Sequence, residues 1–135
     1  MFLCGDSPRR TGMSAKMAAI VLGIVFVVIG LLGFVNNPVL GLFQVNIWHN
    51  LIHLISGLVL LAGAYSSLGS GMALKIIGVV YALVAILGFF LVTSDGMLLG
   101  FIAMNDADKW LHVVLAVVIL VAGFGLPDDD AKMAM

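Results

Sequence analysis

The chain has 135 residues, of which 63% are hydrophobic and 10% charged, with a formal net charge of −1 and a mean hydropathy of +1.24. This composition excludes a water-soluble globular domain, because so few charged side chains cannot cover a water-facing surface. It also excludes a nucleic-acid-binding domain, which needs an excess of basic residues on one face.

Residues 1–16 form an N-terminal tail before the first apolar block. Arg9 and Arg10 precede that block as basic residues precede the core of a signal peptide. The block is longer than the roughly 7–15 residues of a signal core and has no small-residue cleavage site, so we expect an uncleaved helix. Met13 resembles a natural start, and Cys4, the only cysteine, is expected to be a free cytoplasmic thiol.

Four apolar blocks follow, each long enough to cross the hydrocarbon layer as about 20 residues of helix. Lipid offers no partner for backbone polar groups, so only helices or closed barrels span it, and these blocks lack the alternation of barrel strands. The sequence therefore predicts an all-α integral membrane four-helix bundle in a transmembrane domain of residues 17–126, followed by an acidic tail at 127–135. The predicted helices are 17–35, 47–64, 72–92 and 110–126.

The basic residues predict the orientation of this bundle. If the blocks simply alternate across the membrane, Lys109 falls on one side and all the others on the opposite side: Arg9, Arg10, Lys16, Lys75 and Lys132. Positive residues concentrate on the cytoplasmic side, so we expect both termini in the cytoplasm. Trp48 and Trp110 then lie at the outer interface, which suits an indole ring.

The two halves of the chain repeat one another at an offset of 59 residues. Each half carries a glycine, an asparagine and a histidine at the same spacing before an apolar helix: Gly41 and Gly100, Asn46 and Asn105, His53 and His112. We interpret this as two tandem two-helix repeats related by an axis along the membrane normal. The apolar connections before the second and fourth helices are expected to cap the outer end of the bundle.

Polar residues recur at spacings of three and four at the start of the second and fourth helices, so each set shares one helix face. Polar side chains are costly in lipid, and these faces should therefore turn toward the bundle interior, a partner or water. The second-helix set is Asn46, His49, Asn50, His53 and Gly57; the fourth-helix set is Asn105, Asp108, Lys109, His112 and Ala116. Gly57 and Ala116 would permit close helix contact.

Several chemistries could use these residues. His49, His53 and His112 could bind a transition metal, with Asp108 one turn before His112. Histidines of two helices could also ligate haem, although His53 is expected about two turns into its helix and His112 near a helix start, which would tilt the ring. A proton path would need a buried acid at mid-membrane, and the predicted helices contain none there.

The alternative needs no ligand: the polar side chains hydrogen-bond the helices together, each bond contributing about 0.6–2 kcal/mol in a membrane. The sequence favours this structural or accessory role, with a haem- or metal-binding protein as the second hypothesis. We find no nucleophile that would indicate an enzyme. The expected partners are the lipid bilayer and either further copies of the chain or a larger membrane complex.

Two motifs resemble those of a known family. N-I-W-H-N-L-I-H-L-I-S-G at residues 46–57 and N-D-A-D-K-W-L-H at 105–112 are similar to the signatures of small bacterial four-helix membrane proteins defined as a domain of unknown function. The resemblance covers roughly residues 23–123, although Ala116 stands where the pattern leads us to expect glycine. It implies the four-helix topology and, because the family is bacterial, a place in the inner membrane of a bacterium. It implies no reaction.

Overall fold

A computed structural model describes residues 12–128 as an all-α bundle of four helices. Each helix is long and apolar enough to cross a membrane, as the sequence predicted. The elements are α1 (Ala15–Leu32), α2 (Ile47–Tyr65), α3 (Ser70–Phe90), the short strands β1 (Met97–Leu98) and β2 (Ile102–Ala103), and α4 (Asp106–Gly125). The residues discussed above that lie outside the described range are Cys4, Arg9, Arg10 and Lys132.

The start of α4 differs from the prediction because side chains cap the helix. Asn105 Oδ1 accepts a hydrogen bond from the Asp108 N–H, and the Asp108 carboxylate accepts one from the Asn105 N–H. This capping box satisfies two backbone N–H groups, so α4 begins at Asp106 although its first residues are polar. Trp110, the predicted start, lies a full turn inside the helix.

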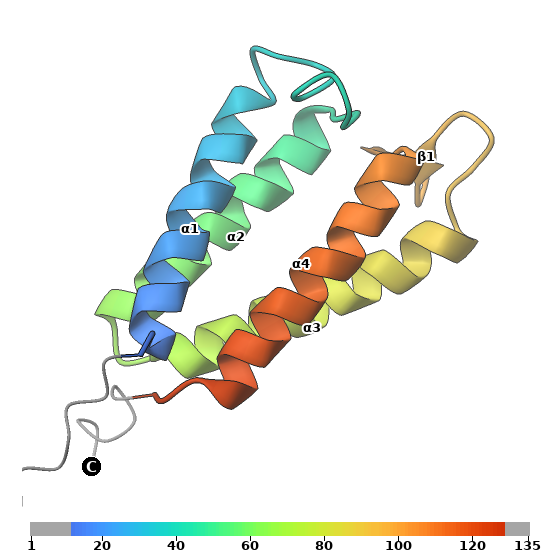
Figure 1. The fold of residues 1–135 in the computed structure, drawn as a ribbon. Coiled ribbons are helices and arrows are strands. Elements are labelled where there is room, and N and C mark those ends of the chain that lie inside the picture. Colours follow the sequence, from blue (N-terminus) through green and yellow to red (C-terminus); the bar gives the residue numbers. More distant parts are fainter. Residues whose placement is uncertain (1–11, 129–135) are drawn as a thin grey trace, which may run out of the picture.

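The helices form two antiparallel pairs (Figure 1). α1 packs mainly on α2, and α3 mainly on α4. Residues 33–46 and 91–105, which connect the helices within each pair, lie at one end of the bundle, here called the loop end. At the other end, here called the termini end, the Ala15 N–H donates to the Pro127 carbonyl, so the two ends of the described chain meet there. A chain that crosses a membrane four times must have both of its ends on the same side, as this bundle does.

The repeat seen in the sequence has a counterpart in the geometry. Both connections at the loop end make the same turn, with a leucine and a glycine at positive φ: Leu40 at 55° and Gly41 at 72°, Leu99 at 53° and Gly100 at 81°. Cation–π contacts at the termini end also recur at the offset of 59, pairing Lys16 with Tyr65 and Lys75 with Phe124. Equivalent residues of the two halves therefore occupy equivalent places at both ends of the bundle.

The two connections fold back onto the bundle. Val39 and Leu98, at equivalent positions of the two turns, are 3% and 1% exposed. Leu98 packs with Ile102 and Met104 in a small apolar cluster at the ends of α2 and α3. The connections thus cap the loop end, as expected from their apolar composition, although the two-residue strands β1 and β2 were not predicted.

Glycines bring α1 and α2 close together. A Cβ added at Gly57 would lie 2.6 Å from the Gly23 carbonyl oxygen and 2.8 Å from the Val27 nitrogen, both of them backbone atoms of α1. Real side chains do not approach backbone this closely. The absence of a side chain at Gly57 therefore sets the separation of this helix pair, which is how small residues act at membrane helix interfaces.

We expect Gly57→Ala to destabilise the bundle by about 1–3 kcal/mol, because the added methyl group forces the two backbones apart. The free energy of unfolding in detergent micelles, measured with a denaturing detergent, checks this. The matched control is Gly125→Ala, because no described residue beyond the adjoining stretch of α4 lies within 4 Å of the added Cβ, so stability should be unchanged or slightly raised. Equal stability of Gly57→Ala and the native protein would contradict this account of the α1–α2 contact.

Candidate three-histidine site

Two asparagine side chains join the two halves at the loop end. Asn46 caps α2 by accepting a hydrogen bond from the His49 N–H, and its amide donates to the Phe101 carbonyl at 2.7 Å. Asn105 caps α4, and its amide donates to the Leu42 carbonyl, also at 2.7 Å. Because Phe101 and Leu42 are themselves 59 residues apart, the two bonds are equivalent. They hold the beginnings of α2 and α4 next to each other.

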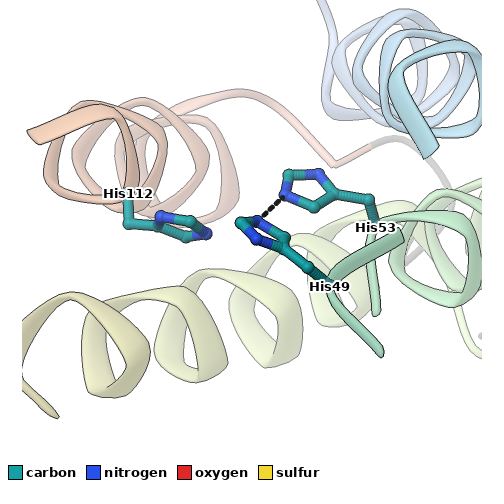
Figure 2. Close-up of side chains that lie close together, drawn as sticks. All are labelled: His49, His53 and His112. Atoms are coloured by element: carbon teal, nitrogen blue, oxygen red, sulfur yellow. Dashed lines mark hydrogen bonds between the residues drawn. The ribbon is translucent and has the colours of Figure 1, made fainter. Parts of the chain in front are cut away.

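The three histidines of the chain meet directly below these caps (Figure 2). His49 and His53 come from successive turns of α2, and His112 comes from α4. All three are buried, with 2%, 5% and 2% exposure. One ring nitrogen of each lies within 4.8 Å of those of the other two. The structure thus brings together the three residues that the sequence singled out as metal ligands.

Backbone carbonyls fix the tautomers of two of these rings. His49 Nδ1 donates to the Ala103 carbonyl at 2.7 Å, and His112 Nδ1 donates to the Asp108 carbonyl at 2.6 Å. A carbonyl only accepts, so Nδ1 carries the hydrogen in both rings. In the neutral rings Nε2 of His49 and Nε2 of His112 consequently present lone pairs, which is the state in which a histidine binds a metal.

His53 completes the cluster but is incompletely satisfied. Its Nε2 lies 3.2 Å from Nε2 of His49 and can donate to that lone pair. Its Nδ1 is buried and has no hydrogen-bond partner among the described residues. An unpaired buried ring nitrogen costs free energy, and hydrocarbon around a membrane bundle offers nothing to repair it. The cluster is therefore not fully explained as a hydrogen-bond network.

Aromatic rings surround the histidines. Phe26 of α1 stacks on His53 with the ring centroids 5.3 Å apart, and Tyr81 of α3 stacks on His112 at 5.5 Å. The Tyr81 hydroxyl donates to Ser56, which donates to a carbonyl of its own helix. All four helices thus contribute to the site. The sequence analysis missed Phe26 and Tyr81; a tyrosine in the middle of an apolar block, whose hydroxyl needs a partner, was the available signal.

The other predicted residues take different roles. Asn50 packs beside Gly33 at the end of α1, and Gly57 contacts α1 as described above. Asp108 is 1% exposed and caps α4, while Lys109 pairs with Asp106 at 2.9 Å. Ala116 is buried in the apolar core of the bundle. Among the residues of the two predicted polar faces, only the three histidines come together in one cluster of side chains.

The geometry of the cluster does not suit haem. The expected difference in depth between the two possible axial ligands was wrong, because His53 is the seventh residue of α2 and His112 the seventh of α4. The obstacle is space: the cavity lined by His49 and His53 has a volume of about 210 Å³, below the roughly 300–1,000 Å³ of pockets for drug-sized ligands. The ring centroids of His53 and His112 are also only 5.8 Å apart, which leaves no gap for a macrocycle between them.

Comparison with known proteins identifies the family. The family model described as Domain of unknown function (DUF4383) matches residues 16–125. The match spans all four helices and most of the chain, so this protein belongs to that family. No curated protein and no solved structure gives a significant match.

The hydrogen bonds to carbonyls make a prediction for the metal-free protein. We expect His49 and His112 to be in the form protonated at Nδ1, because Ala103 and Asp108 accept from that atom. Long-range ¹⁵N–¹H NMR spectra of protein labelled at histidine, assigned with single His→Gln variants, would show this directly. The Nε2-protonated form at either residue would contradict the orientation of these rings.

Proposed function

We propose that this DUF4383 protein holds a divalent transition-metal ion, such as Zn²⁺ or Cu²⁺, between the two halves of its bundle. The single observation that carries the proposal is the meeting of three buried histidine rings from α2 and α4. Imidazole nitrogen suits these ions, and three histidines are a common protein ligand set for zinc. The proposed ligands are His49, His53 and His112.

The distances between the ring nitrogens support the proposal. Zn–N bonds of about 2.0–2.1 Å in a tetrahedral site put two ligand nitrogens about 3.3 Å apart. Nε2 of His49 and Nε2 of His53 are already 3.2 Å apart. The nitrogens of all three rings lie within 4.8 Å, so His112 would need to move inward by about 1.5 Å at most to complete the site.

The surroundings of the rings also support a bound ion. The carbonyls of Ala103 and Asp108 hold two rings by Nδ1, as outer-shell acceptors do in known metal sites. His53 could bind an ion through Nε2 in the form that carries its hydrogen on Nδ1, and the bond to the ion would then replace the hydrogen bond from His53 to His49. Three neutral ligands leave the ionic charge unbalanced, and the buried carboxylate of Asp108, which lines the same cavity as His49 and His53, supplies one compensating negative charge.

We place this protein in the inner membrane of a bacterium, with both termini in the cytoplasm. Lys16 and Lys75 lie at the termini end, where they contact Tyr65 and Phe124, and Lys109 lies at the loop end. This distribution agrees with the positive-inside rule. Most of the exposed surface of the helices is apolar, so further copies or a larger complex can pack against it, and an accessory role in such an assembly is compatible with a bound metal.

The proposal predicts about one equivalent of metal per chain. The protein should be purified without a histidine tag, loaded with Zn²⁺ or Co²⁺, dialysed, and analysed by elemental mass spectrometry. Co²⁺ bound by three histidines should give visible d–d absorption bands. We expect His53→Ala and His112→Ala each to weaken binding by at least tenfold, because each removes one of three ligands.

The matched control is Asn50→Ala, since Asn50 is also a buried polar residue of α2 but lies outside the cluster. This variant should bind metal as tightly as the native protein. If the native protein binds no metal while His53→Ala loses folding or assembly, the histidines are structural. A Soret band in the absorption spectrum would instead support the haem-binding hypothesis.

The orientation can be tested with a thiol reagent that does not cross membranes. In a background with Cys4→Ser, we expect the cysteine of a Leu42→Cys variant, in the first loop-end connection, to react in intact cells. The cysteine of a Ser67→Cys variant, in the turn between α2 and α3, should react only after the membrane is permeabilised. The reverse pattern would place the termini outside.

A further inference from the structure

A cavity leads to the histidine cluster from one side of the bundle. It lies between α1, the first connection, α2 and α4, and has a volume of about 210 Å³. Its deep residues, His49, His53 and Asp108, are buried, whereas Leu40 at its rim is 70% exposed. Almost all of its surface is apolar. The cavity therefore connects the outside of the bundle with the histidine rings through an apolar passage.

The cavity touches two of the three proposed ligands. His49 and His53 line it, while His112 does not. Three protein ligands leave the fourth position of a tetrahedral ion for an external molecule, as in catalytic zinc sites. Since the rings of α2 form one wall of the cavity, a molecule within it lies beside the ion that these rings would hold. Figure 2 shows both rings extending from α2 toward α4.

We propose that the fourth ligand of the metal is a small uncharged molecule that enters through this apolar cavity. The inference rests on the proposed metal site and specifies its ligand. Apolar cavities of about 150 Å³ are known to bind benzene or xenon, so the volume here suits a molecule up to that size. An anion would lose its hydration on entry without gaining polar partners along the walls, and it is therefore selected against.

The experiment compares two linear probes of the same number of heavy atoms, neutral methyl isocyanide and anionic azide. Each is titrated into the Co²⁺-loaded protein in detergent while the d–d bands are recorded. A water-exposed Co²⁺ complex with three imidazole ligands provides the intrinsic preference of the ion. Relative to that reference, we expect the protein to favour methyl isocyanide over azide by at least about tenfold.

Filling the cavity should remove this response. Val39 is buried and lines the cavity, so Val39→Phe should abolish the effect of methyl isocyanide while the Co²⁺ spectrum remains. The matched control is Val28→Phe, which changes a residue of α1 that is 55% exposed. Leu40→Trp, at the exposed rim of the cavity, is a second test that adds no larger side chain to the core. It should also abolish the effect of methyl isocyanide.

The possible results separate the inference from the proposal on which it rests. If the native protein binds no Co²⁺, the metal site itself is refuted. If Co²⁺ binds but azide competes as well as in the reference complex, the apolar route is refuted. The same holds if both Val39→Phe and Leu40→Trp keep their Co²⁺ and still respond to methyl isocyanide as the native protein does.

Discussion

The structure depends on satisfying polar groups without water, because helix ends and polar side chains in a bilayer find partners only within the protein. Asn46 and Asn105 meet this requirement at the loop end. Each caps its own helix and donates to a carbonyl of the opposite half. The same two side chains therefore begin α2 and α4 and hold them side by side. His53 and His112 are the seventh residues of these two helices. The pairing of the helices therefore brings their ring centroids to within 5.8 Å of each other.

The candidate site arises where the two halves stop being equivalent. His49 and Asp108 occupy the same position of the repeat, three residues after the capping asparagine. In α4 this position completes a capping box, and in α2 it carries the third histidine. The surrounding rings also differ, since Phe26 and Tyr81 correspond to Ala85 and Leu22. A nearly symmetric frame thus supports an asymmetric centre, with two histidines from one helix and one from the other.

Much of this arrangement could be predicted from the sequence. Length and hydropathy indicated the four helices, and the offset of 59 residues put His53 and His112 at equivalent positions of the two halves. The start of α4 was predicted too late because four of residues 105–109 are polar. The capping box formed by Asn105 and Asp108 begins the helix there nevertheless. Tyr81 and Phe26 lie within apolar blocks, where composition does not distinguish a residue facing lipid from one facing the cluster. Which partner Asn46 would bind depends on long-range packing that spacing cannot reveal.

The division of the histidines between α2 and α4 bears on how the protein assembles. Each helix pair has its own close packing, and such hairpins can insert into a membrane before they associate. The cluster exists only after the two hairpins have docked. An ion held by rings of both hairpins would form its bonds last and would add to the hydrogen bonds of Asn46 and Asn105 that already join the loop ends of the two hairpins. Metal supply would then change how firmly the two hairpins are held together, and not whether they dock.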